Sequence, residues 1–120
     1  MSFYQHKTAF VTGGSTGIGL AIAKALAKEG SHVSIFARTV SKLETAATEV
    51  KQTANNSAQK INFYSVDTSD NLDVQNVFAK AIEENGVPDI LINCVGIAQP
   101  DYFENITFEI FDKTIKTNLY

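Results

Sequence analysis

The chain has 120 residues, of which 44% are hydrophobic and 19% charged, and its formal net charge is −3. This length and composition predict one globular domain over residues 1–120, and the acidic balance argues against a nucleic-acid-binding surface. No apolar run approaches the roughly 18 residues that cross a bilayer, and residues 1–7 lack the apolar stretch of a signal peptide. With a single cysteine, Cys94, no internal disulfide can form, so we expect a cytoplasmic protein, and no metal site.

The first predicted elements are a buried strand at residues 7–12 and a helix that follows it. Apolar residues of this helix recur in the helical pattern of one buried stripe, whose members are Ile18, Ile22, Ala25 and Leu26. Gly30 is expected to end the helix in a left-handed conformation. A second strand follows at residues 32–37, and a second helix is expected to begin with a capping box formed by Ser41 and Glu44.

The rest of the chain repeats this alternation of strands and helices. The second helix is expected to bury Leu43, Ala46, Ala47 and Val50. A polar loop at residues 54–60 precedes a third strand at 61–66, a third helix that ends at Asn85 and Gly86, a fourth strand at 89–93 and a fourth helix from Thr107 onward. The expected inward residues of the last two helices are Val74, Val77, Phe78, Ala81 and Ile82, then Phe108, Phe111 and Ile115.

Strands that alternate with helices predict parallel pairing through right-handed crossovers. The strands are apolar without polar alternation, so helices are expected to cover both faces of the sheet. The predicted fold is therefore a doubly wound parallel α/β sheet. In such sheets ligands bind at the carboxyl ends of the strands, where the strand order reverses.

Residues 12–19, T-G-G-S-T-G-I-G, lie at that position, between the first strand and the first helix. Gly13 and Gly17 would leave backbone N–H groups open to a phosphate, and Gly19 would let the helix pack against the sheet. The helix N-terminus adds a positive dipole end, and the hydroxyls of Ser15 and Thr16 add donors. The alternative is a purely structural turn, which the strand–turn–helix context disfavours.

The residue after the second strand indicates which dinucleotide the site prefers. An NAD-binding chain usually places Asp or Glu there for the ribose 2′-hydroxyl, whereas this chain has Arg38. A guanidinium pairs with a 2′-phosphate in fork geometry, and Lys42 can point to the same pocket. These residues favour NADP(H) over NAD(H), the alternative being that both cations are solvated surface charges.

Four further residues stand where such a sheet carries ligands. Asp67, after the third strand, can hold an adenine edge or cap the turn into the third helix. Asn93 and Gly96, at the end of the fourth strand, lie beside a ligand or form an ordinary turn. Asn118 falls on the inward stripe of the fourth helix, so its amide either organises a water or catalytic side chain or bonds a nearby carbonyl.

Three motifs in this order resemble the short-chain dehydrogenase/reductase family. Residues 12–19 are similar to its cofactor loop, N-C-V-G at residues 93–96 is similar to its N-N-A-G motif, and Asn118 falls where the family has the asparagine of its catalytic tetrad. The resemblance covers residues 7–120. It implies a Rossmann fold, here its first four strands in the order 3-2-1-4, and NAD(P)-dependent oxidation of alcohols or reduction of ketones. It also implies a homo-oligomer for the complete protein.

The resemblance further implies a role for each candidate residue. Those expected to bind NADP(H) are Gly13, Ser15, Thr16, Gly17, Ile18, Gly19, Arg38, Lys42, Asp67, Asn93 and Gly96. The loop residues hold the pyrophosphate and ribose, the two cations select the 2′-phosphate, Asp67 contacts adenine, and Asn118 supports the proton relay. The strings A-R-x-x-x-K-L, S-V-D and I-N-C-x-G resemble 3-ketodihydrosphingosine reductases, which implies reduction of a 3-keto sphingoid base with NADPH.

The chain departs from the family pattern in two ways. Cys94 and Val95 replace the usual Asn-Ala, and the catalytic serine and Tyr-x-x-x-Lys pair of the family are absent from residues 1–120. We therefore expect that these 120 residues are an incomplete chain of a reductase that acts on a small ketone, and that they are inactive alone. The alternatives are a non-catalytic NADP(H)-binding module and a truncated inactive fragment. Because the fourth strand would present an open apolar edge, the isolated 120 residues are expected to fold poorly or to associate.

Overall fold

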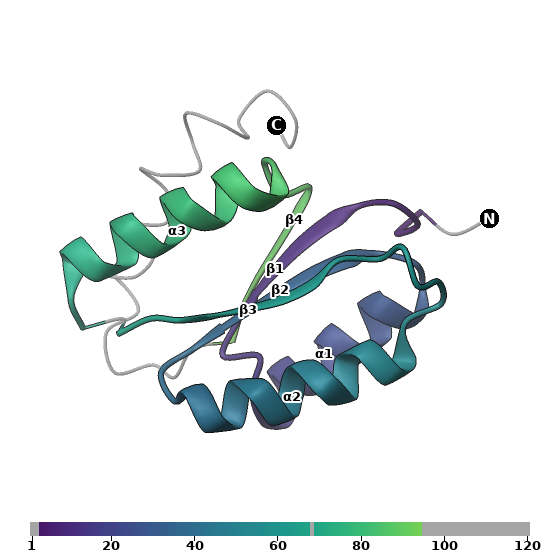
Figure 1. Ribbon diagram of the computed structural model, residues 1–120, viewed down its shortest axis with the longest axis horizontal. Helices are drawn as coiled ribbons and strands as arrows, with labels where there is room; N and C mark the ends of the chain where they lie inside the picture. Colours follow the sequence, from purple (N-terminus) through teal and green to yellow (C-terminus); the bar gives the residue numbers. More distant parts are fainter. Residues whose placement is uncertain (1–2, 68, 95–120) are drawn as a thin grey trace.

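The computed structural model describes residues 3–67 and 69–94. Its strands are β1 (Thr8–Thr12), β2 (His32–Ala37), β3 (Ile61–Ser65) and β4 (Ile90–Asn93), and its helices are α1 (Gly17–Lys28), α2 (Val40–Thr53) and α3 (Asn71–Asn85). The strands form one parallel sheet in the order β3-β2-β1-β4, which confirms the predicted fold class and strand order (Figure 1). The expected fourth helix, Gly96 and Asn118 lie outside the described residues.

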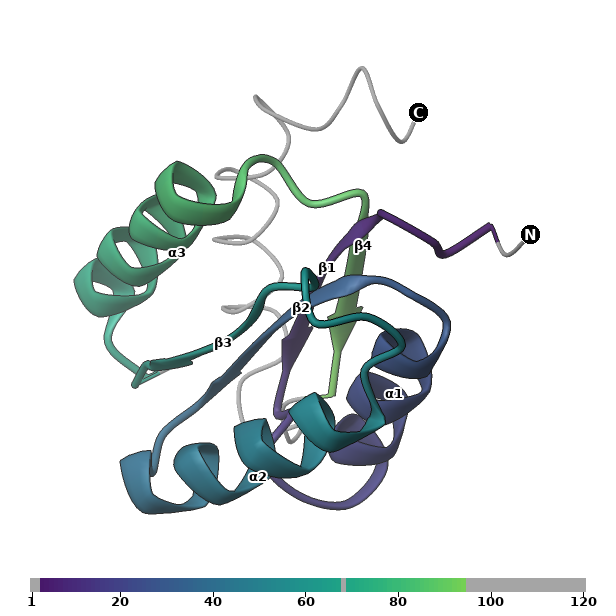
Figure 2. The ribbon, with the colours of Figure 1, turned by 45° about the vertical axis from the view of Figure 1, so that its right-hand side comes forward.

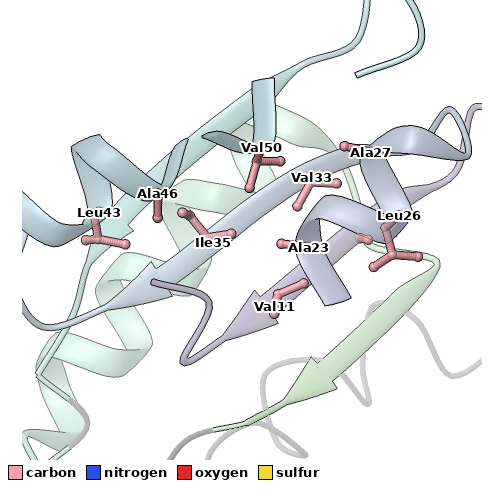
Figure 3. Close-up of a cluster of buried hydrophobic side chains, with 10 residues drawn as sticks. Val11, Ala23, Leu26, Ala27, Val33, Ile35, Leu43, Ala46 and Val50 are labelled. Atoms are coloured by element: carbon pink, nitrogen blue, oxygen red, sulfur yellow. The ribbon is translucent and has the colours of Figure 1, made fainter. Parts of the chain in front are cut away.

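Helices cover both faces of the sheet. α1 and α2 lie side by side on one face, and α3 lies on the other (Figures 1 and 2). The first face is packed with aliphatic side chains from the sheet and both helices, among them Val11, Ala23, Leu26, Val33, Ile35, Leu43 and Val50 (Figure 3). The second face carries a largely aromatic cluster of Phe10, Phe36, Val66, Val74, Phe78 and Ala81. Each central strand supplies both clusters because its successive side chains point to opposite faces.

Aromatic packing fixes the end of β2, where the chain leaves the sheet. Phe36 is fully buried and stacks on Phe78 of α3, with ring centroids 4.5 Å apart and an interplanar angle of 18°. Its ring also lies 5.1 Å from that of Phe10 on β1 and 5.2 Å from that of Tyr64 on β3. The residues that follow Phe36 therefore leave the sheet directly beside a well-packed aromatic cluster.

The buried stripe of α1 is shifted from the predicted one by one position toward the C-terminus. Its buried residues are Gly19, Ala23, Leu26 and Ala27, whereas Ile18 is 75% exposed and Ala25 is exposed as well. Residues 18–23 are all apolar or glycine, so the helical period alone does not decide which of them faces inward. The close fit of Gly19 against the preceding loop decides it.

The predicted start of α2 is wrong. The helix begins at Val40 with Thr39 as its N-cap, and no side chain caps it. Ser41 and Glu44 therefore lie inside the helix, and Ser41 uses its carbonyl to accept a 3.2 Å hydrogen bond from the Thr45 hydroxyl. The predicted inner face is nevertheless confirmed, with Leu43, Ala46 and Val50 buried and Ala47 half-buried.

The ends of α1 and α3 and the position of β4 agree with the predictions. Gly30 follows α1 with a φ of 98°, and Gly86 follows α3 with a φ of 83°, both in the left-handed region that favours glycine. Within the described part of the chain β4 pairs with β1 alone, and its apolar residues, Ile90 to Ile92, are half-buried. The expectation of poor folding or association that was attached to this edge remains a prediction.

Candidate functional site

A hollow of about 580 Å³ opens at the carboxyl edge of the sheet. Its lining comes from the ends of β1 and β2, the turn after β1, the first turn of α1 and the residues that follow β2, β3 and β4: Thr12, Gly13, Ser15, Thr16, Gly17, Ile18, Gly19, Phe36, Ala37, Arg38, Val66 and Cys94. This is the place where doubly wound sheets bind ligands. Six of the predicted loop residues and Arg38 are thus brought together.

The turn after β1 is folded tightly on itself. Gly13 and Gly17 have φ angles of 69° and 57°, which residues with a side chain rarely adopt. A Cβ on Gly19 would lie 2.8 Å from the carbonyl carbon of Gly13, and one on Gly14 would lie 2.8 Å from Cγ2 of Ile35. Gly19 therefore packs against the loop itself rather than against the sheet, which corrects the predicted reason for this glycine.

Gly17 shows that the backbone of the turn is open toward a ligand. Gly17 lines the hollow, and a Cβ on this residue would meet nothing within 4 Å, so its backbone faces open space. The N–H of Gly13, by contrast, is bound to the carbonyl of Phe36 at 2.8 Å, which ties the turn to β2 and corrects the expectation that this N–H is open to a phosphate. The turn is thus anchored at one end and presents bare backbone at the other, which fits a phosphate group.

The two helices that begin beside the hollow have no side-chain caps. Thr16 is the N-cap of α1 and Thr39 that of α2, and neither side chain accepts a capping hydrogen bond. Neither helix has an acidic residue in its first turn. In α3, Asp70 caps the helix by accepting from the backbone N–H groups of Leu72 and Asp73, at 3.0 and 3.1 Å. The first-turn N–H groups and positive dipole ends of α1 and α2 are therefore available to an external anion.

The two predicted cations line adjoining hollows rather than one. Arg38 lines the larger hollow, whereas Lys42 lines a second one of about 380 Å³ between the turn and α2. The two hollows meet at Ser15 and Thr16, which line both. A phosphate at this junction would therefore be approached by a cation from each side.

Asp67 stabilises the turn that leads into α3. Its Oδ1 accepts hydrogen bonds from the N–H and the hydroxyl of Ser69, at 3.0 and 2.6 Å. These bonds hold the pKa of the Asp67 carboxyl below its usual value, with a smaller contribution from the positive charge of Arg38. The N-cap of α3 is Asp70, so Asp67 caps the preceding turn, and it is Val66 rather than Asp67 that lines the hollow.

Asn93 is held by the end of β1. Its Oδ1 accepts a 2.9 Å hydrogen bond from the hydroxyl of Thr12, a side chain that is fully buried. The next residue, Cys94, donates its backbone N–H to the carbonyl of Thr12 at 3.0 Å and lines the hollow. Among the lining residues, Thr12, Phe36, Ala37, Val66 and Cys94 had not been predicted. Their common signal is position, because each stands at or just after the carboxyl end of a strand.

Within residues 3–67 and 69–94, no three side chains of His, Cys, Asp or Glu are grouped as a metal site. None of the helices in this part of the chain is long and apolar enough to cross a membrane.

Known proteins resemble this chain in both sequence and fold. The family described as "short chain dehydrogenase" matches residues 7–120. The 3-ketodihydrosphingosine reductase of Bos taurus is 37% identical over 90% of this chain and 33% of its own length. The L-rhamnose 1-dehydrogenase (NADP(+)) of Thermoplasma acidophilum is 36% identical over 97% of this chain and 44% of its own length.

The solved structure of L-sorbose reductase from Gluconobacter frateurii, complexed with NADPH and L-sorbose, superposes with a TM-score of 0.70. It is 30% identical, and the match covers 96% of this chain and 46% of that one. The chain therefore spans less than half the length of these three proteins. With a family match that extends over nearly all of its residues, the chain belongs to the short-chain dehydrogenase/reductase family.

Proposed function

We propose that this chain forms the coenzyme-binding part of an NADP(H)-dependent oxidoreductase that reduces a ketone to an alcohol. The observation that carries the proposal is Arg38, which directly follows β2 and lines the larger hollow. An acid at this position would hold the 2′-hydroxyl of NAD(H), whereas a guanidinium would pair with the 2′-phosphate of NADP(H). Within residues 3–67 and 69–94 Arg38 forms no ion pair, so its charge is available.

In the proposed complex the dinucleotide lies across the carboxyl edge of the sheet. Its pyrophosphate and ribose lie against the backbone and hydroxyls of the turn, at Gly13, Ser15, Thr16, Gly17, Ile18 and Gly19, where the N–H of Gly13 itself stays bonded to Phe36. Arg38 and Lys42 bind the 2′-phosphate, and Asp67 and Asn93 contact the adenosine. When bound, the coenzyme supplies the hydride. Gly96 beside the ribose and Asn118 in the proton relay complete the proposed set.

We propose a 3-keto sphingoid base as the ketone. Support comes from the bovine relative, whose name states that it reduces 3-ketodihydrosphingosine. The activity belongs to the complete protein, in which residues 1–120 would be the N-terminal part of a single domain. A homo-oligomer is proposed for it as well.

The coenzyme preference is tested by titration calorimetry on the complete protein as its gene encodes it. We expect NADPH to bind more tightly than NADH. Arg38→Ala should raise the Kd for NADPH about 10- to 100-fold, since a hydrogen bond to a charged group is lost, and leave the Kd for NADH within about twofold. Lys28→Ala removes an exposed cation at the far end of α1 and should change neither. Equal affinities in the wild type would contradict the proposed coenzyme.

The location of the site and the reaction are tested separately. Cys94, the only cysteine among residues 1–120, lines the hollow, so saturating NADPH should slow its alkylation by N-ethylmaleimide several-fold, as followed by mass spectrometry of the peptide that contains Cys94. Reduction of 3-ketodihydrosphingosine is followed by the loss of NADPH absorbance. Protection of Cys94 without turnover of any ketone would favour the non-catalytic NADP(H)-binding module. Turnover of other ketones alone would refute only the proposed substrate.

A further inference from the structure

The second hollow holds charges of both signs. Between the turn and α2 it is lined by Ser15, Thr16, Ser41, Lys42, Thr45, Ala46 and Glu49. Lys42 would attract a phosphate at the junction of the two hollows, whereas the carboxylate of Glu49 would repel it. Left alone, these two charges would largely cancel, and the hollow would offer a phosphate no net attraction.

A third charge reaches Glu49 from the neighbouring helix. Nζ of Lys24, on α1, lies 2.9 Å from Oε1 of Glu49, on α2. The two side chains are 36% and 42% exposed, so this ion pair contributes little to the stability of the fold. The ion pair does change the charge of the hollow, because neutralising Glu49 turns a net charge near zero into a net positive charge.

We propose that Lys24 and Glu49 are specificity-determining residues for NADP(H), although neither is expected to touch the coenzyme. Lys24 neutralises Glu49, and this leaves the charge of Lys42 effective toward the 2′-phosphate. This inference rests on the proposed function, because it requires the 2′-phosphate at the junction of the hollows. NADH has no phosphate there, so the ion pair acts on the difference between the two coenzymes.

The size of the effect follows from Coulomb's law in a solvated groove. A unit charge acting on a dianionic phosphate from roughly 10 Å through solvent changes the Kd about two- to fivefold at low ionic strength. Screening over a Debye length of about 8 Å reduces this factor at physiological salt. The expected signature is thus a modest, salt-sensitive change confined to NADPH.

The test is a charge cycle on the complete protein, with the Kd of NADPH and NADH measured at low salt. Lys24→Gln leaves Glu49 unpaired and should raise the Kd for NADPH about two- to fivefold. Glu49→Gln leaves Lys24 unpaired and should lower the Kd for NADPH by a similar factor. In the double variant the Kd should return close to the wild-type value. The matched controls are Lys28→Gln at the far end of α1 and Glu83→Gln on α3, which covers the other face of the sheet; both residues are exposed and line neither hollow.

Opposite shifts for the two single variants, restored in the double variant and absent for NADH, would support the inference. A merely structural ion pair would instead shift the Kd of both coenzymes alike or leave the Kd of NADPH unchanged in the single variants, and either result would overturn it. So would controls that change the Kd of NADPH as much as the two test variants. A wild type that binds NADPH no better than NADH would refute the proposed 2′-phosphate site itself, and the inference with it.

Discussion

Gly19 gives the sharpest test of how the turn after β1 is built. It is the third residue of α1, and glycine in a helix ordinarily destabilises by about 0.5–1 kcal/mol relative to alanine. By that rule Gly19→Ala would stabilise the protein. The structure predicts the opposite, because the new Cβ would lie 2.8 Å from the carbonyl carbon of Gly13, and closer still to its oxygen.

The magnitude follows from that overlap. Ordinary contact begins at 3.4 Å, so at the carbon alone α1 and the turn must separate by 3.4 − 2.8, or 0.6 Å. Both partners are backbone, so no side chain can rotate away. Overpacking of this kind typically costs about 1–3 kcal/mol, which outweighs the gain in helix propensity. A displacement approaching 1 Å in the turn should also raise the Kd for NADPH about 10- to 100-fold, since it misplaces the phosphate contacts.

The assay combines chemical denaturation with NADPH titration of the same variant. Gly86→Ala is the matched control: Gly86 has a φ of 83°, a Cβ on it would meet nothing within 4 Å, and it lies away from the hollow. That change should cost about 1–3 kcal/mol through backbone strain and leave the Kd unchanged. The reasoning is refuted when Gly19→Ala is as stable as wild type or binds NADPH with unchanged affinity.

Three further predictions concern stability. Asp70→Ala removes the cap of α3 and should cost about 1 kcal/mol in urea unfolding without affecting NADPH affinity; an unchanged midpoint would contradict the role of the cap. Phe78→Ala removes a fully buried ring that stacks on Phe36 and should cost about 3–5 kcal/mol in the same assay, so a loss below 1 kcal/mol would be inconsistent with the aromatic core. Burial, and then the charges of Lys60 and His6, lower the pKa of His32 from its ordinary 6.5, so the unfolded state takes up the proton first and stability should fall as the pH drops below 6.5. Melting temperatures recorded against pH should show a flatter acid limb in His32→Asn, and parallel curves would exclude His32 as the cause.

The strands and their parallel pairing could be predicted because the signals for them are local. Residues 32–37, H-V-S-I-F-A, are mostly apolar and lie between Gly30-Ser31 and Arg38, and β2 has those bounds. Parallel order then follows from the intervening helices, since a crossover back to a parallel strand has one strongly preferred hand. The order β3-β2-β1-β4 is predicted by the family resemblance, because right-handed crossovers alone also allow other orders, such as 2-1-3-4.

The face of α1 could not be predicted because its sequence is apolar on several sides. Ile18 has the side chain expected of a core residue, yet it lies at the rim of the hollow and is 75% exposed. Gly19 carries no hydrophobic signal, yet it is fixed in place by contact with Gly13. The helical period of the apolar residues predicts the spacing of a buried stripe, but tertiary contacts determine the residue at which the stripe starts.

The start of α2 and the details of the site depend on contacts between distant residues. Thr39 and Ser41 are both good N-cap residues, and only the course of the chain after β2 shows that the helix begins at Val40. Likewise, the bond between Thr12 and Asn93 joins residues 81 positions apart in the chain. It requires β1 and β4 to be neighbours in register, which the separate motifs do not reveal.

A crystal structure of the complete protein with NADPH would test the central claim most directly. We predict that the pyrophosphate lies against the backbone from Gly17 to Gly19 and that the 2′-phosphate lies within hydrogen-bonding distance, about 3 Å, of the Arg38 guanidinium. A dinucleotide bound elsewhere, or one whose 2′-phosphate points away from both Arg38 and Lys42, would contradict the account.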